Sequence, residues 1–223
     1  MLVKKRMTRD PVTVSPAQSL ADALRLTRAR RIRHLPVVLD GEVVGIVSDR
    51  DVRLAMPSPL TESDDRRVAF LEGTAISAIM RGDVATIGGN DTVEDAAKLM
   101  RRRRIGALPV VDAHGRLLGI ITESDVLDAF VEILGPPGQS SRIEVALPDR
   151  PGELARAMRV IGEEQGVNVC SLMVPPAAAG ERRMAIVQVG TIDPRPVIEA
   201  LESAGFEVGW PSLETDLRLG GGA

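Results

Sequence analysis

Residues 45–51 read Gly-Ile-Val-Ser-Asp-Arg-Asp, and residues 119–125 read Gly-Ile-Ile-Thr-Glu-Ser-Asp. In each stretch a short β-branched run ends in a hydroxyl residue, and a carboxylate follows three positions later. A hydroxyl and a carboxylate at this spacing are typical of a helix N-terminus. Both stretches therefore predict a strand that runs directly into a helix.

These two stretches belong to a longer duplication. Residues 7–38 match residues 80–111 at fourteen of thirty-two positions, and one extra residue in the second copy then moves the offset from 73 to 74. Two copies are too few for a solenoid, which needs at least three stacked repeats. We therefore expect two small units that bury one face against each other and leave a pair of quasi-equivalent clefts.

Each copy has the same predicted order of strand, helix, strand, strand and helix. Ser19 with Asp22, and Thr92 with Asp95, mark the start of the first helix in the two copies. A Gly-containing turn then separates two β-branched runs, which is a hairpin signal. The expected extended segments are 12–14, 35–39 and 43–47 in the first copy, and 85–87, 108–111 and 117–121 in the second.

A different unit follows the duplication, so the expected fold class is α/β (α+β) in more than one domain. Its apolar pattern predicts the order βαββαβ, a ferredoxin-like arrangement. The sole cysteine, Cys170, falls on an inferred strand, where we expect a buried and unreactive thiol. The predicted divisions are a first repeat at 1–56, a linker at 57–73, a second repeat at 74–134, a Gly- and Pro-rich linker at 135–140, the C-terminal unit at 141–212 and a tail at 213–223.

Composition excludes several classes of protein. The chain has 28 basic and 31 acidic residues and a net charge of -3, so neither nucleic acid nor an acidic membrane surface is an expected partner. Aromatic residues make up only 2%, which leaves few stacking platforms for bases. We find no apolar run of the roughly 20 residues that a spanning helix requires, and no signal-peptide pattern. A single cysteine fits a reducing compartment, so we expect a cytoplasmic protein.

The pairs Ser48 with Asp51 and Thr122 with Asp125 are also candidate ligand contacts. A hydroxyl beside a carboxylate can donate hydrogen bonds to the vicinal diol of a ribose and accept them from it. The alternative is that both pairs only cap their helices. Their recurrence at matched positions, each after a glycine and a buried strand, favours the binding interpretation.

Segment 7–14, the runs 33–37 (Arg-His-Leu-Pro-Val) and 106–110 (Gly-Ala-Leu-Pro-Val), and the two Gly-x-x-(Ser/Thr)-x-x-Asp motifs occur together in the duplicated region. With these segments the sequence resembles, over about residues 1–132, the cystathionine-β-synthase (CBS) domain family. This resemblance implies a disc-like pair that binds adenosine nucleotides in clefts between the copies.

The resemblance implies a role for each matching residue. The motif aspartates would hold the ribose hydroxyls, the neighbouring Ser or Thr would sit by the phosphates, and backbone near the first short strand would read the adenine. Arg33 and His34 would be further phosphate partners, although both also suit a solvated helix end. Because Gly106 and Ala107 take those positions in the second copy, the two clefts should differ in phosphate affinity. The implied nucleotide-binding residues are Thr13, Val14, Arg33, His34, Ser48, Asp51, Thr86, Ile87, Thr122 and Asp125.

The C-terminal unit has a tight turn at 149–154 (Asp-Arg-Pro-Gly-Glu-Leu) that leads into a predicted helix, and segment 166–169 (Gly-Val-Asn-Val) follows that helix. With these two segments the unit resembles, over about residues 141–212, the ACT domain, a small regulatory module that binds amino acids or similar metabolites. The resemblance implicates Gly152 and Asn168 in binding an amino-acid effector, commonly where two subunits meet. The alternative is that the unit only dimerises, since glycine and asparagine are both common turn residues.

Catalysis finds little support in the sequence. His34 and His114 are not at matched positions, and no Cys or His cluster has metal-ligand spacing. The arginine run 101–104 is expected to be a solvated helix end, with one arginine reaching a phosphate as the alternative, because four successive helical residues point all around the axis. We therefore predict no catalytic residue, no metal and no cofactor.

A CBS pair followed by an ACT domain is similar to the acetoin-utilisation regulatory proteins of bacteria. The resemblance implies a non-catalytic, energy-sensing homodimer that binds a nucleotide such as AMP, ADP or ATP and acts on an unknown target protein. The rival hypothesis is a dimerising subunit of a partner enzyme whose ligand sites are vestigial.

Overall fold

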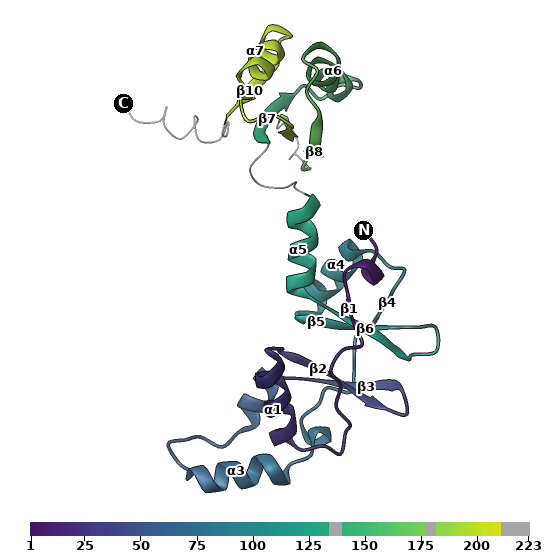
Figure 1. Ribbon diagram of the computed structural model, residues 1–223, viewed down its shortest axis with the longest axis vertical. Coiled ribbons are helices and arrows are strands. Elements are labelled where there is room, and N and C mark those ends of the chain that lie inside the picture. Colours follow the sequence, from purple (N-terminus) through teal and green to yellow (C-terminus); the bar gives the residue numbers. More distant parts are fainter. Residues whose placement is uncertain (134–139, 177–181, 211–223) are drawn as a thin grey trace. The chain divides into compact units, whose positions relative to one another are not determined.

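The computed structural model describes residues 1–133, 140–176 and 182–210, in two compact units, Met1–Ala129 and Phe130–Ala223 (Figure 1). The predicted Gly-Pro-Pro-Gly run at 135–138 and the predicted tail at 213–223 lie outside the described residues. Among the helices of the described ranges, none combines the length and apolar character needed to cross a membrane.

Both repeats have the predicted order of helices and hairpin strands, and a hydroxyl residue caps the first helix of each. The strand predicted at 12–14 is reduced to a single bridge of Val14 with Val37, and the first strand of that repeat lies earlier in the chain. Ser19 and Asp22 form a complete capping box, and the Thr92 side chain accepts a hydrogen bond from the backbone N of Asp95. The first repeat contains the 3-10 helix η1 (Val3–Lys5), β1 (Thr8–Arg9), α1 (Leu20–Arg30), β2 (His34–Leu39), β3 (Glu42–Ser48) and α2 (Asp49–Ala55). The second contains η2 (Ile76–Ala78), β4 (Ile87–Gly88), α4 (Val93–Arg103), β5 (Ala107–Val111), β6 (Leu117–Thr122) and α5 (Glu123–Ile133).

The segment predicted as a linker, 57–73, contains a further helix, α3 (Asp64–Gly73). Ser63 caps this helix by accepting a hydrogen bond from the backbone N of Arg66. Phe70 and Leu71 pack, partly buried, against the core of the first repeat. Charged residues surround these two side chains in the sequence, so the segment shows no clear apolar pattern of a helix.

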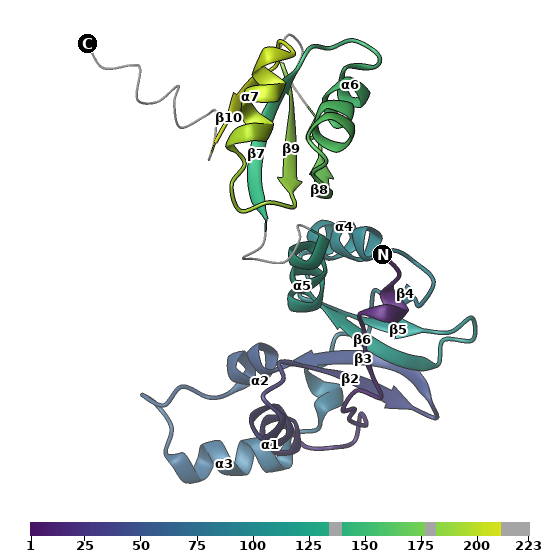
Figure 2. The same ribbon diagram turned by 45° about the horizontal axis from the view of Figure 1, so that its top comes forward.

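Each repeat adds its leading residues to the other repeat. Strand β1 of the first repeat pairs antiparallel with β6 of the second, in a sheet of order β1-β6-β5-β4. In return, Arg81 at the start of the second repeat forms an antiparallel bridge with Ile46 of β3. Figure 2 shows the N-terminal segment lying beside strands of the second repeat. Two further bridges follow the same 73-residue offset, Leu2 with Thr92 and Ser19 with Ala75.

This exchange extends into the two hydrophobic cores. Val3, near the start of the chain, is fully buried in the core of the second repeat beside Leu108 and Ile121. Ile76, which lies 73 residues further along, is fully buried in the core of the first repeat beside Leu35. Each core therefore depends on residues from the other copy, and the two repeats form one interdependent unit.

The C-terminal unit has the predicted βαββαβ order, in an antiparallel sheet of strand order β10-β7-β9-β8. Ile143, Val187 and Leu201 are fully buried in its core. Its elements are β7 (Ser141–Leu147), α6 (Glu153–Arg159) continued by a π-helical turn (Val160–Glu164), β8 (Val169–Met173), β9 (Arg183–Val189), α7 (Arg195–Ser203) and β10 (Glu207–Gly209).

The prediction that Cys170 is buried is wrong, because its side chain is exposed. Strand β8 forms an edge of the sheet, so it has a neighbour on one side only. Its pairing with β9 also shifts register between Val169 and Ser171, which leaves Cys170 as the extra residue of a bulge. A sequence pattern does not reveal which strand lies at an edge.

Candidate functional site

The start of α2 holds the first predicted hydroxyl–carboxylate pair. Oδ2 of Asp51 accepts hydrogen bonds from the backbone N of Ser48 at 2.9 Å and from its Oγ at 2.5 Å. The Ser48 Oγ in turn accepts one from the backbone N of Asp51 at 3.2 Å. Thr122 and Asp125 repeat this arrangement, with both bonds to Oδ2 at 2.7 Å. Both pairs therefore cap their helices.

Capping occupies only one oxygen of each carboxylate. Oδ1 of Asp51 lies 3.5 Å from Nη2 of Arg81, and the Asp51 side chain remains 18% exposed. Oδ1 of Asp125 receives no hydrogen bond from the part of the chain that the structure describes. The second oxygen of each pair can still accept a hydrogen bond from a ligand hydroxyl, so capping and binding are compatible.

Ser48 and Asp51 line a cleft of about 450 Å³ that both repeats build. His34 reaches it because β2 pairs His34 with Ser48 in register. The exchange of leading segments adds the residues that follow Arg81, since Arg81 pairs with Ile46 of β3. The lining residues are His34, Ile46, Ser48, Arg50, Asp51, Leu54, Arg81, Asp83, Val84, Ala85, Arg103, Arg104, Ile105, Gly106 and Ala107.

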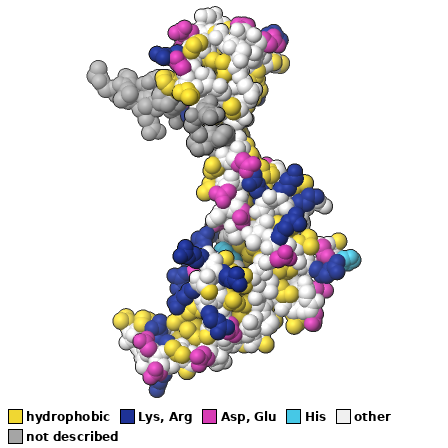
Figure 3. Space-filling view, viewed as in Figure 1, with side chains coloured by type: hydrophobic (Ala, Val, Ile, Leu, Met, Phe, Trp, Pro, Cys, Tyr) yellow, Lys and Arg dark blue, Asp and Glu magenta, His cyan; other side chains and the backbone are white. Residues whose placement is uncertain are grey.

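Arginine dominates the charge of this cleft. Figure 3 shows basic side chains gathered on this face of the first unit. Arg103 is paired with Asp83 at 3.6 Å, while the run 101–104 is exposed, as expected of a helix end. Arg50 lies within the motif at 45–51, but its side chain was not among the predicted site residues. Arg81 could not be predicted locally, because only the exchange between repeats brings it to the pair at α2. The charged lining consists of Arg50, Arg81, Arg103 and Arg104 with Asp51 and Asp83.

Burial holds the pKa of His34 below its ordinary value of 6.5, and the positive charge of Arg33 lowers that pKa further. Asp49, Asp51 and Glu123 act in the opposite direction. The net lowering keeps the imidazole neutral at neutral pH. A neutral imidazole can donate one hydrogen bond to a ligand without adding charge.

Only some of the residues implied by the family resemblance lie around Ser48 and Asp51. His34 does, whereas Arg33 is exposed and does not line this cleft. Val84 and Ala85 line the cleft in place of the expected pair at 86–87. Thr13 is exposed, and Val14 is buried in the core of the first repeat. The expected base-binding residues Thr13, Val14, Thr86 and Ile87 are therefore not among the residues that line this cleft.

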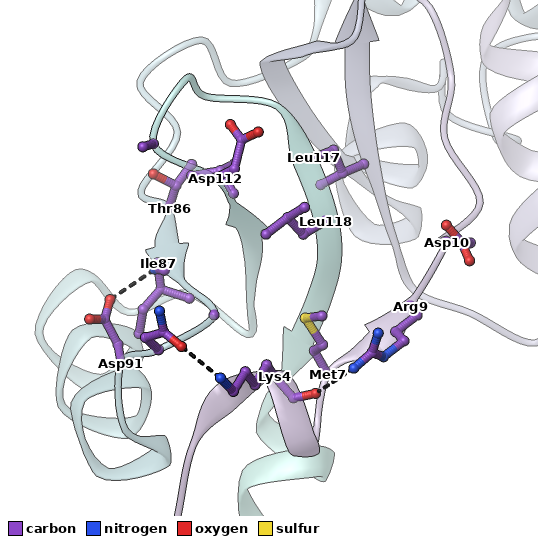
Figure 4. Close-up of a pocket in the computed structure, with 15 residues that line it drawn as sticks. Lys4, Met7, Arg9, Asp10, Thr86, Ile87, Asp91, Asp112, Leu117 and Leu118 are labelled. Carbon is purple, nitrogen blue, oxygen red and sulfur yellow. Dashed lines mark hydrogen bonds between the residues drawn. The ribbon is translucent and has the colours of Figure 1, made fainter.

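Thr86 and Ile87 instead line a separate cavity of about 850 Å³ in the same unit (Figure 4). Lys4 Nζ donates to Asn90 Oδ1 at 2.8 Å on its rim. Three carboxylates and two cationic side chains line this cavity, so it offers less positive charge to a phosphate than the smaller cleft. These charged residues are Asp10, Asp91 and Asp112 with Lys4 and Arg9.

In the C-terminal unit, the structure does not bring Gly152 and Asn168 together within one chain. Gly152 precedes α6 with a φ of 91°, a left-handed conformation that favours glycine. Asn168 follows the other end of the same helical segment, and its carbonyl accepts a hydrogen bond from the backbone N of Gly190 at 2.8 Å. The seven residues of α6 and the five of its π-helical continuation lie between the two, so they flank opposite ends of this helical segment. A site that used both residues would need a second copy of the chain.

The other chemistry-bearing side chains remain dispersed. His114 lies in the β5–β6 turn, where its backbone N donates to Asp112 Oδ1 at 2.8 Å. Within the described ranges, no three His, Cys, Asp or Glu side chains are grouped so that they could hold a metal ion. The cleft at Ser48 and Asp51 is therefore the best-supported ligand site.

A family model for the CBS domain matches residues 3–58 and 76–132. The chain belongs to the CBS-domain family. The two matches begin at the exchanged leading residues and end with the second helix of each repeat, so they correspond to the two CBS copies of the first unit. The fold is thus a CBS pair followed by a βαββαβ unit.

Known relatives support the CBS pair. The chain is 43% identical over 143 residues to a CBS domain-containing protein of Dictyostelium discoideum, covering 63% of this chain and 99% of that protein. It is 34% identical over 149 residues to the inosine-5'-monophosphate dehydrogenase of Korarchaeum cryptofilum, covering 67% of this chain but only 28% of that enzyme. The similarity to the enzyme is therefore confined to a minor part of it.

Solved structures resemble the same region. The CBS domain pair of protein MJ0100, in complex with 5'-methylthioadenosine and S-adenosyl-L-methionine, has a TM-score of 0.50 and 28% identity and covers 59% of this chain and 97% of that one. A structure described as an acetoin utilization protein (AcuB) from Vibrio cholerae has a TM-score of 0.50 and 32% identity, over 60% of this chain and 93% of that one. The CBS-pair protein CBSX2 from Arabidopsis thaliana has a TM-score of 0.53 and 30% identity, over 60% and 97%.

Proposed function

We propose that this CBS pair is a non-catalytic cytoplasmic sensor of an adenosine nucleotide such as AMP, ADP or ATP. The observation that carries the proposal is the Asp51 carboxylate, which keeps Oδ1 toward a basic cleft while Oδ2 caps α2. That oxygen suits a ribose hydroxyl, and the arginines suit phosphate. The adenosine ligands bound by the MJ0100 pair support the same ligand class.

Arg81 gives the bound nucleotide a means of changing the protein. Its guanidinium lies 3.5 Å from Asp51 Oδ1, and its backbone is hydrogen-bonded to Ile46 in both directions. A ribose hydroxyl at Oδ1 competes with the guanidinium, and a phosphate in the cleft offers it a stronger partner. Movement of Arg81 would then be transmitted to the leading segment of the second repeat, which is the regulatory signal that we propose.

The test is isothermal titration calorimetry of the full chain with AMP, ADP, ATP and S-adenosylmethionine. Asp51→Asn should weaken adenylate binding about tenfold or more, because a hydrogen bond to a charged group contributes roughly 1.5–3 kcal/mol. Asp22→Asn is the matched control, since Asp22 caps α1 in the same way but does not line the cleft. If both variants bind as the wild type does, Asp51 is not the ribose contact.

For the C-terminal unit we propose an ACT-like regulatory role in a homodimer, with an amino-acid effector at Gly152 and Asn168 of two chains. The βαββαβ order and the turn at Gly152 support this role. Light scattering should give about twice the 23.8 kDa mass of the chain. Asn168→Ala should weaken binding of the amino acid that a thermal-shift panel identifies, and a monomeric mass would contradict a site shared between chains.

The second candidate function is a dimerising subunit of a partner enzyme. The capping role of both hydroxyl–carboxylate pairs favours it, because capping gives each pair a function that needs no ligand. Thermal shift separates the two candidates: a melting temperature raised by an adenylate supports the sensor. No shift with any adenosine ligand supports the subunit. The regulated target and any link to acetoin remain to be identified by co-purification from the native host.

A further inference from the structure

We infer that the cleft at Ser48 and Asp51 selects an adenosine nucleotide with two or three phosphates, whereas the second pair, Thr122 and Asp125, serves an adenosine ligand of lower negative charge. The inference rests on the proposed function, and it states that the two sites prefer adenosine ligands of different negative charge. Its basis is the different number of arginines that the two repeats place around otherwise equivalent carboxylates.

The first cleft carries a surplus of positive charge. Four arginines and two carboxylates line it, and His34 adds no charge at neutral pH. Asp51 caps α2 through Oδ2 and lies 3.5 Å from Arg81 through Oδ1, and Asp83 is paired with Arg103 at 3.6 Å. The two carboxylates therefore offset two of the four guanidiniums and leave a surplus of positive charge, and a polyphosphate is the adenosine substituent that matches such a surplus.

These arginines come from three separate parts of the fold, which suits a ligand group longer than one phosphate. Arg50 lies in the first turn of α2, and Arg81 lies on the exchanged segment beside β3. Arg104 ends α4 in a left-handed conformation with a φ of 55°. A chain of two or three phosphates has more acceptor oxygens than a single phosphate, so it can pair with guanidiniums from more than one of these parts.

The residues that correspond in the duplicated sequence to the lining of the Ser48 cleft differ in charge. At the offsets of 73 and 74 residues, Ser124 corresponds to Arg50 and Thr8 to Arg81, so two of the four arginines are replaced by hydroxyl residues. Asp128 corresponds to Leu54, which adds a carboxylate. The charged set is then balanced, with Arg30, Arg31 and Arg33 against Asp10, Asp125 and Asp128.

The larger cavity does not compete for the polyphosphate. Its three carboxylates outnumber Lys4 and Arg9, and Lys4 already donates to Asn90 at 2.8 Å. An anion entering that cavity would meet a net negative lining, which disfavours it. The surplus of arginine therefore distinguishes the Ser48 cleft both from its counterpart and from the cavity at Thr86 and Ile87.

A reciprocal exchange of side chains tests the inference on the full chain. Arg50→Ser gives the first cleft the residue of the second, and Ser124→Arg does the reverse. Both side chains are exposed, so neither change should affect folding, and circular dichroism checks this. Adenosine, AMP, ADP and ATP are titrated by calorimetry at low and physiological ionic strength, without divalent cations.

We expect ATP to bind the wild type at least tenfold more tightly than adenosine, with a preference that shrinks as salt screens the charges. Arg50→Ser should lower ATP affinity about tenfold and leave adenosine affinity unchanged, since it removes a charge-assisted contact to phosphate. Ser124→Arg should tighten ATP binding at the second, weaker site.

Equal affinity for ATP and adenosine, or equal losses of both in Arg50→Ser, would overturn the assignment by charge while the adenosine sensor stands. Failure of every adenosine ligand to bind the wild type would overturn the proposed function, and this inference with it. The comparison of ATP with adenosine thus keeps the two failures distinct.

Discussion

Replacing Gly119 by alanine tests how closely the exchanged segments pack. A Cβ at Gly119 would lie 2.7 Å from the backbone O of Thr8 and 2.8 Å from Sδ of Met7. Strand β1 would then have to move away from β6, which it pairs with through Thr8 and Arg9. Gly45 is the equivalent position in the first repeat, but a Cβ there would approach a flexible side chain most closely, at 2.7 Å from Sδ of Met80.

The difference between the two glycines sets the expected magnitudes. Overpacking typically costs about 1–3 kcal/mol, and replacing glycine with alanine returns about 0.4–1 kcal/mol by restricting the unfolded chain. Neither glycine has a positive φ, so alanine meets no backbone strain at either position. We expect Gly119→Ala to lower the free energy of unfolding by about 1–2 kcal/mol, and Gly45→Ala by less than about 1 kcal/mol, because Met80 can rotate away.

Urea unfolding with two probes measures these losses in the right part of the molecule. Far-ultraviolet circular dichroism reports both units, whereas fluorescence of Trp210, the only tryptophan of the chain, reports the C-terminal unit. The Trp210 transition should serve as an internal control, and the transition of the CBS pair should move to lower urea in Gly119→Ala. A loss in Gly45→Ala as large as that in Gly119→Ala would refute the argument that the backbone of β1 lies against Gly119.

Three further predictions concern single side chains. Ile76→Ala should lower the free energy of unfolding of the CBS pair in urea by about 2–5 kcal/mol, because Ile76 is fully buried in the core of the other repeat. Leu60→Ala is the control: this side chain is 94% exposed, so the free energy of unfolding should change by less than about 0.5 kcal/mol. The pKa of His34 is lower in the folded protein than its ordinary value of 6.5, so the unfolded chain takes up the proton first. The stability of the CBS pair should therefore fall as the pH drops through about 6.5. Thermal melts of His34→Gln should lose this dependence, and an unchanged pH profile in that variant would argue against a neutral, buried imidazole. Cys170 is exposed, so a thiol reagent should label it in the native protein nearly as fast as in urea; strong protection would show that a second chain covers β8.

Local features of this fold could be predicted from the sequence, and features that depend on distant pairing could not. The helix caps at Ser19 and Ser48 and the two hairpins each depend on residues only a few positions apart. A local sequence pattern is therefore enough to predict them. The βαββαβ order of the C-terminal unit was predictable for the same reason. The exposure of Cys170 depends on which strand lies at the sheet edge, and no local pattern encodes that.

The candidate site shows the same division. Ser48 and Asp51 were predicted from their spacing, and the structure adds that their carboxylate serves both the cap and the cleft. Arg81 escaped prediction because it lies thirty residues from Asp51 and reaches it only through the bridge to Ile46. Aligning the two copies reveals a duplication, but it does not show that each copy contributes its first residues to the other.

That contribution of first residues bears on how such a chain can originate and be divided. A single, unfused repeat would leave the positions of Val3 or Ile76 unfilled in its own core, and a second identical repeat could supply them in a symmetric, domain-swapped dimer. Joining two such genes end to end turns that dimer into one polypeptide and frees the two halves to diverge. Cutting the chain between the repeats should therefore yield fragments that recover their structure only when mixed.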